Sequence, residues 1–198
     1  MGGNIGNLLL KNIKMDKDDY TVGLFSVPFC HKKIQNWKEK KSQLLKLKVE
    51  EHINYENEDN IATDFPFSNK NNYSQKIEEI LQEELNSIYM HIGVENYFIK
   101  NSWIEVSEEN MNHNPHNHGA LGLSAVVFLN YNPKYHKPTH FISPIGNFET
   151  GVNLHFIPFN VDEGSLIVFP SMINHFTMPN KSDVPRTIIS FNMSKKMH

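Results

Sequence analysis

Apolar residues at helical spacing dominate the first half of the chain. The clearest run covers residues 73–92, with apolar positions at i, i+3, i+4 and i+7, and Gly93 follows it. This pattern predicts one amphipathic helix that ends at the glycine. A weaker set of apolar positions among many lysines predicts a second helix within 33–49. The polar, Asn-rich stretch 50–72 between them predicts an irregular loop.

The second half alternates short apolar runs with Gly and Pro, which is typical of β-strands. The expected strands are 103–106, 121–129, 152–159, 165–169 and 187–193, with one more at 21–27 in the first half. Short strands at spacings of about ten residues predict a β-sandwich or barrel. We therefore expect a mainly β protein with flanking helices packed outside the sheets.

Composition narrows the class of protein. The chain has 198 residues, is 39% hydrophobic and has a net charge of −3, so it can bury a core. It has no basic excess with which to neutralise phosphates, which argues against a nucleic-acid partner. A single cysteine, Cys30, excludes an internal disulfide and fits a reducing compartment. No apolar run approaches the length of about 18 residues that a membrane span needs, so we expect a cytoplasmic protein.

Histidines gather in the β-rich half, where seven of the eleven lie between His113 and His175. In an extended segment alternate side chains point the same way, so His116 and His118 can ligate one metal ion together. The alternative is a polar loop that happens to be rich in histidine. His175 follows the predicted strand 165–169 and begins another.

Arginine is unusually rare: of 19 Lys and Arg residues, 18 are Lys and one is Arg186. Codon bias explains the lysines, because Asn and Ile are abundant as well. It does not explain the position of the exception, which opens the last predicted strand eleven residues after His175.

Together these residues form an ordered signature. Its parts are Trp103, His116-x-His118, Leu123-Ser124, the segment 164–171 (Gly-Ser-Leu-Ile-Val-Phe-Pro-Ser), His175, Arg186 and Ser190-Phe191-Asn192. In this order and spacing the chain resembles the non-haem Fe(II)- and 2-oxoglutarate-dependent oxygenases, most of all the small oxygenases of phages and marine bacteria. The resemblance implies a double-stranded β-helix (jelly-roll) core at 97–193 and a helical N-terminal part at 1–96, within a single domain 1–198.

The resemblance also implies cofactors and a reaction. His116 and His175 would ligate Fe(II), and Arg186 would bind the C5 carboxylate of 2-oxoglutarate. Iron that binds this co-substrate and dioxygen needs three protein ligands and three open positions. Arg suits the carboxylate better than Lys because its planar guanidinium pairs bidentately. The implied reaction is hydroxylation of a small-molecule or peptidyl substrate, with release of succinate and CO2.

Two positions depart from the commoner pattern of the family. Most relatives have Asp or Glu where this chain has His118. We expect His118 to be the third ligand; the alternatives are a carboxylate from elsewhere, such as Glu105 or Glu149, or a site that binds metal without turnover. Some relatives have Ser at the position of Ile188, and Ser124 is the candidate that would supply a hydroxyl to 2-oxoglutarate instead.

Other functions remain open at this point: a cupin-like metal-binding module, a zinc enzyme that uses the three histidines, or an interaction protein with a relict site. Arg186 favours the oxygenase, because a zinc hydrolase has no use for a cation there. We expect His113 to lie near the site without ligating metal, Trp103 to be a core residue, and loops 50–72 and 130–151 to be candidate lids. The sequence favours no particular substrate or oligomeric state.

Overall fold

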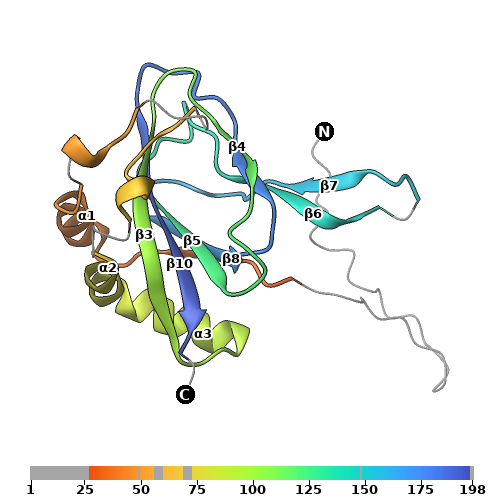
Figure 1. The fold of residues 1–198 in the computed structure, drawn as a ribbon, viewed down its shortest axis with the longest axis horizontal. Coiled ribbons are helices and arrows are strands. Elements are labelled where there is room, and N and C mark those ends of the chain that lie inside the picture. Colours follow the sequence, from red (N-terminus) through yellow and green to blue (C-terminus); the bar gives the residue numbers. More distant parts are fainter. Residues whose placement is uncertain (1–26, 49, 56–59, 69–72, 148, 197–198) are drawn as a thin grey trace.

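The computed structural model describes residues 27–48, 50–55, 60–68, 73–147 and 149–196 (Figure 1). The strand expected at 21–27 lies outside these residues, apart from Val27. In chain order the elements are β1 (Cys30–Lys33), α1 (Trp37–Leu45), η2 (Glu50–His52), β2 (Ala62–Thr63), η3 (Phe65–Phe67), α2 (Ser74–Ile80), α3 (Gln82–Ile92), β3 (Tyr97–Ser107), β4 (His113–His116), β5 (Leu123–Asn130), β6 (His140–Gly146), β7 (Asn153–Phe156), β8 (Ser165–Pro170), β9 (His175–Thr177) and β10 (Arg186–Lys195).

The strands form two antiparallel sheets. Sheet A has the order β1-β8-β5-β10-β3-β2, and sheet B has the order β4-β9-β6-β7. The C-terminal strand β10 lies in the middle of sheet A, because it pairs with β3 on one side and β5 on the other. Two antiparallel sheets with helices at their side confirm the predicted class, a mainly β fold with flanking helices.

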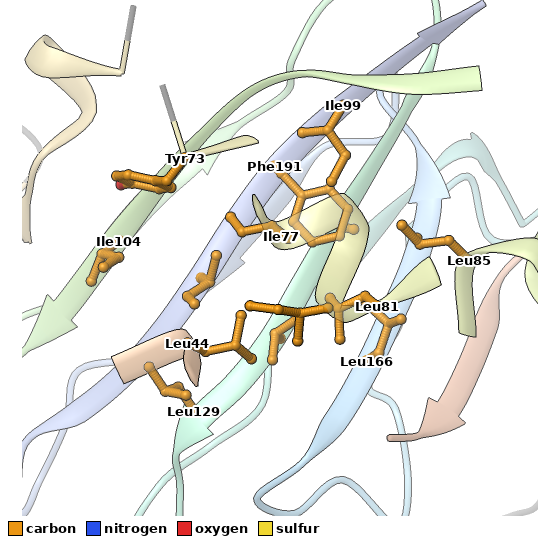
Figure 2. Close-up of a cluster of buried hydrophobic side chains, with 14 of the residues drawn as sticks. Leu44, Tyr73, Ile77, Leu81, Leu85, Ile99, Ile104, Leu129, Leu166 and Phe191 are labelled. Carbon is orange, nitrogen blue, oxygen red and sulfur yellow. The ribbon is translucent and has the colours of Figure 1, made fainter. Parts of the chain in front are cut away.

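The alternation of side chains along sheet A separates two hydrophobic layers. The outward-facing layer packs against the helices: Leu44 of α1 and Ile77 of α2 share a cluster with Ile104 and Phe191 of the sheet (Figure 2). The opposite face meets sheet B, where Phe128, Ile167, Phe169 and Ile188 pack with Phe141 of β6. The helices are therefore scaffold, and the space between the sheets is left for the polar residues of the site.

The helices lie where the sequence predicted them, but their lengths differ from the prediction. The helix expected over 73–92 is kinked at the fully buried Leu81, where φ is −103° and ψ is 12°. Its backbone bonds continue through the kink, since Leu81 N donates to Ile77 O and Leu85 N to Leu81 O. The helix expected within 33–49 covers Trp37–Leu45, and Lys33, at the expected start, is instead the last residue of β1. Among the described helices, none is long and apolar enough to cross a bilayer.

Both expected loops contain regular structure. The described parts of 50–72 include two 3-10 turns and β2, which pairs with β3 and so adds a strand to sheet A. The stretch 130–151 contains β6, which with β7 forms the hairpin that projects from the body of the molecule in Figure 1. All four residues of β7 are exposed, so the strand expected at 152–159 is shorter than predicted and lies outside the core.

Candidate functional site

Three histidines meet in sheet B. His116 of β4 and His175 of β9 are cross-strand partners, and the ladder therefore brings together two residues from distant parts of the chain. His118 follows β4 and completes the group: one ligand nitrogen from each of the three residues lies within 4.8 Å of the others. Within the described residues, this group of side chains is placed to hold a metal ion, and it consists of the three histidines of the sequence signature.

The chain beyond β4 is fixed by its own polar contacts. The backbone N–H of His118 donates to the carbonyl of Ser171 at 2.9 Å. The Asn117 side chain donates to Oδ1 of Asn174 at 2.9 Å and accepts from the backbone N–H of Gly119 at 3.0 Å. Both segments that flank the site, the one after β4 and the one before β9, are thereby tied to each other.

The orientation of the imidazoles suits a divalent metal ion. Nδ1 of His116 lies 2.7 Å from the carbonyl of Asn114, and Nδ1 of His175 lies 2.9 Å from that of Ile173. A carbonyl accepts only, so each Nδ1 donates and each Nε2 carries the lone pair that a metal needs. Nε2 of His118 is 3.1 Å from Nε2 of His175. Two nitrogens bound at about 2.1 Å to one ion, at a right angle, are about 3 Å apart, so the residues present fit a metal.

Burial keeps two of these imidazoles neutral. Loss of solvation and the nearby His116 together lower the pKa of His175 to about 3. The same two causes lower the pKa of His118 to about 4. Neutral imidazole is the form that ligates a metal, so neither residue has to lose a proton near pH 7 before binding one.

Arg186 is the buried cation of the inter-sheet space. Its side chain is 3% exposed, and its guanidinium lies over the Phe128 ring at 5.9 Å. Its Nε and Nη2 have no hydrogen-bond partner among the residues that the structure describes. Burial lowers the pKa of Arg186, and Glu105 and Tyr131 oppose that change, so the group stays cationic. Two unpartnered donors of one planar group suit the two oxygens of a carboxylate.

Glu105 is one of the two carboxylates considered as a third ligand. It is buried beside the histidines, and both of its oxygens already have partners. Oε1 accepts from Trp103 Nε1 at 2.7 Å and from Ser190 Oγ at 3.1 Å, and Oε2 lies 3.3 Å from His113 Nδ1. Burial alone would raise the pKa of Glu105, but His113, Trp103 and Arg186 hold it well below its usual range. Glu149, the other carboxylate, is exposed next to the β6–β7 hairpin tip.

Two aromatic rings connect Glu105 with the histidine cluster. The Trp103 ring stacks on His118, with centroids 5.2 Å apart and planes 28° apart. The His113 ring stacks on His116, with centroids 3.9 Å apart and planes 25° apart. Trp103 is a core residue, as the sequence predicts, but its contact with His118 was not foreseen. The sequence indicates only that Trp103 and Glu105, two positions apart in one strand, lie on the same face of β3.

Ser124, which the sequence singled out, and His136, another histidine of the β-rich half, have hydrogen-bond partners of their own. Ser124 is 2% exposed and donates to Asn192 Oδ1 at 2.8 Å, and its oxygen lies 2.9 Å from Ser171 Oγ. His136 is buried, with its ring nitrogens near the N–H of Asn132 and the carbonyl of Val184. Neither His136 nor Ser124 belongs to the three-histidine cluster.

Comparison with known families gives one match to the chain. Residues 101–192 match the model of a family described as "Putative 2OG-Fe(II) oxygenase". The match covers almost all of the segment that carries the signature, and it confirms the resemblance. Fe(II), 2-oxoglutarate and dioxygen, the cofactors that the sequence predicts, are those of this family. A search of curated proteins finds no match.

Solved structures share the fold. SnoN, a non-heme alpha-ketoglutarate-dependent epimerase from nogalamycin biosynthesis, has a TM-score of 0.65 at 11% identity over 84% of this chain and 77% of its own. Its complex with Fe3+, alpha-ketoglutarate and nogalamycin RO gives 0.64 at 12% identity over 84% and 78%. A prolyl-4-hydroxylase from Pseudomonas putida gives 0.55 at 13% identity over 86% and 94%. This likeness confirms the double-stranded β-helix core.

Proposed function

We propose that the protein is an Fe(II)- and 2-oxoglutarate-dependent oxygenase that hydroxylates a C–H bond of a small-molecule or peptidyl substrate and releases succinate and CO2. One observation carries the proposal. A buried guanidinium with two unpartnered donors, that of Arg186, shares the inter-sheet space with a cluster of three histidines. A metal site alone does not require the cation, whereas a co-substrate with a metal-binding end and a free carboxylate requires both.

His116, His118 and His175 would hold the iron through their Nε2 atoms. The carbonyls of Asn114 and Ile173 fix two of the rings, which keeps these lone pairs aimed at one point. Three protein ligands leave three positions for the co-substrate and dioxygen. Bound there, Fe(II) supplies the activation of dioxygen that couples oxidation of 2-oxoglutarate to oxidation of the substrate.

Arg186 would bind the C5 carboxylate of 2-oxoglutarate and so orient its other end toward the histidines. A buried donor without a partner costs about 1–3 kcal/mol, and a carboxylate at Nε and Nη2 removes that cost for both atoms. The surroundings favour the pair: Phe128 lies beside the guanidinium, and Tyr131 raises the pKa of Arg186. In such low-dielectric surroundings an ion pair is stronger than in water.

The hydroxyl of Ser124 is the second group that we propose for 2-oxoglutarate. It is already bonded to Asn192 and Ser171, so a bond to the co-substrate requires that one of these be exchanged or shared. We therefore assign Ser124 a smaller contribution than Arg186.

Two apolar rings beside His175 would keep water away from one side of the site. The rings of Phe141 and Phe169 lie 6.0 Å and 4.9 Å from that of His175. Both belong to the cluster between the sheets, so they separate the histidines from solvent on that side. A dry site protects a reactive centre from side reactions and preserves the strength of the ion pair at Arg186.

A zinc enzyme is the second candidate, because three neutral histidines also suit Zn(II). The buried Arg186 favours the oxygenase over it. The test is an anaerobic titration of the wild-type protein with Fe(II) and then with 2-oxoglutarate, followed by absorption spectroscopy. We expect a visible metal-to-ligand charge-transfer band that saturates with 2-oxoglutarate. Absence of the band under ligand excess, with metal bound, would rule out the proposed co-substrate.

A further inference from the structure

The three-histidine set has an electrostatic consequence. The common facial triad of these iron enzymes contains one carboxylate, whose charge offsets half of the charge of Fe(II). Imidazoles are neutral ligands, so this chain would leave both charges of the ion uncompensated. With Arg186 adding one positive charge and 2-oxoglutarate two negative ones, the loaded site would keep one excess positive charge. An uncompensated charge in a buried site is costly.

Glu105 carries one negative charge beside the site, and this charge offsets the excess when His113, its neighbour at 3.3 Å, is neutral. The residue is 4% exposed, and it lies on β3 of sheet A, opposite β4 and β9 of sheet B. Its charge also acts on Arg186, since it raises the pKa of that guanidinium. Nothing about burial of the fold requires a carboxylate here, because apolar residues fill the equivalent inward positions of β5 and β8.

The contacts of Glu105 lead to two of the three candidate ligands. One oxygen accepts from the indole N–H of Trp103, whose ring stacks on His118. The other faces Nδ1 of His113, whose ring stacks on His116. A single carboxylate therefore fixes the two rings against which the neighbouring imidazoles rest.

We propose that Glu105 is a positioning residue that supplies, from behind the ligands, the negative charge that the three-histidine set lacks. The inference rests on the proposed function for the identity of the metal and co-substrate. It replaces the carboxylate that ligates metal in the common triad with one that acts at a distance through Trp103 and His113. Glu105 is not itself a ligand in this scheme, because both of its oxygens have other partners.

The test compares Glu105→Gln with the wild-type protein in two separate titrations. Gln keeps the size and the acceptor oxygen but loses the charge. We expect Fe(II), and Co(II) as a redox-stable probe, to bind about 10–100-fold more weakly, the usual range for such supporting residues. Binding of 2-oxoglutarate to the metal-loaded variant stays unchanged or becomes tighter, because the pocket has gained positive charge. Glu105→Asp, which keeps the charge, falls between the two in metal affinity.

The opposite effects on metal and co-substrate separate this role from a structural one. Parallel loss of both affinities, or Co(II) affinity equal to that of the wild type, overturns the inference. Glu108→Gln is the matched control, since Glu108 is exposed just beyond β3 and its charge is screened by water; it should bind both ligands as the wild type does. If Glu105→Gln does not fold, Trp103→Phe replaces it. That variant keeps an aromatic ring but loses the indole N–H that donates to Glu105, so Co(II) binding should weaken. Unchanged Co(II) affinity overturns the inference.

The metal titration also keeps the two proposals apart. If the wild-type protein binds Co(II) but shows no band with Fe(II) and 2-oxoglutarate, the proposed function fails while the effect of Glu105 on metal affinity is still measured. A wild-type protein that binds no divalent metal overturns both.

Discussion

Replacement of Arg186 is the most direct test of how the co-substrate is held. We expect Arg186→Ala to weaken binding of 2-oxoglutarate and to leave binding of Fe(II) nearly unchanged. The two unpartnered donors, Nε and Nη2, are the atoms at stake. A hydrogen bond to a charged group contributes about 1.5–3 kcal/mol, so two of them contribute at least about 3 kcal/mol. Since about 1.4 kcal/mol corresponds to a factor of ten, affinity should fall by at least about 100-fold.

The charge of Glu105 increases this effect. Without the guanidinium, the carboxylate of Glu105 loses the cation that lowers its pKa, and a dianionic ligand then meets a more negative pocket. Arg186→Lys keeps a positive charge but cannot pair bidentately, so we expect an intermediate loss of about tenfold.

The assay is the anaerobic charge-transfer titration, with iron binding measured separately by equilibrium dialysis. Lys195→Ala is the matched control, because it removes a positive charge from the exposed far end of the same strand, β10. It should bind 2-oxoglutarate as the wild type does. Wild-type affinity in Arg186→Ala would place the C5 carboxylate elsewhere. Loss of iron binding in the same variant would show that Arg186 holds the fold rather than the co-substrate.

Three further substitutions test the site and its scaffold. His175→Ala removes a ligand from the cluster, and we expect Fe(II) affinity to fall by about 100-fold or more in dialysis; retained affinity would exclude this residue as a ligand. Phe191→Ala empties a fully buried position between sheet and helices, and it should lower the free energy of unfolding by about 3–5 kcal/mol in urea. A loss under about 1 kcal/mol would contradict the packing described. Gly122→Ala places a Cβ 2.5 Å from Met193 O, with φ at +97°, and should destabilise by about 1–3 kcal/mol. Gly119→Ala, with φ at +96° and no atom within 4 Å, is its control and should cost less; equal losses would refute the clash.

The strands and helices that the sequence predicted best are those with the strongest periodic burial. The run 121–129 became β5, which is buried at seven of its eight positions. The runs 165–169 and 187–193 became β8 and β10. These strands occupy the interior of sheet A, where both faces meet apolar layers, so most residues of β5 and β8 are apolar and β10 carries apolar residues among polar ones.

The predictions were wrong where pairing, rather than local composition, creates the element. β6 lies in a stretch with Pro and Gly that reads as a loop, yet it pairs with β9 and β7. β2 has two residues and exists only because β3 offers an edge. Residues 30–33 carry no strand signal, and Lys33 was expected to begin a helix, but they form β1 along β8. Such contacts depend on residues far away in the chain, so no local pattern records them.

The same difference between local patterns and long-range contacts applies to the candidate site. His116, His118, His175 and Arg186 were identified because their types and spacing form a motif. The arrangement behind them was not, since the stacking of Trp103 on His118 and the double use of Glu105 depend on how β3 faces sheet B. Sequence reasoning placed Glu105 among possible ligands, and the structure gives both of its oxygens other partners.

The central place of β10 in sheet A affects how the chain can fold during its synthesis. β3 and β5 have no pairing with each other, and both depend on β10, which is synthesised after them, to fill the gap between them. A growing chain that lacks residues 186–195 therefore exposes two long unpaired strand edges, the kind of surface that invites aggregation and chaperones. Arg186 arrives with that same strand. The histidines are synthesised earlier, but the residue that we propose for the co-substrate is added only with the strand that closes the sheet, so a growing chain that lacks β10 would not hold 2-oxoglutarate next to the metal.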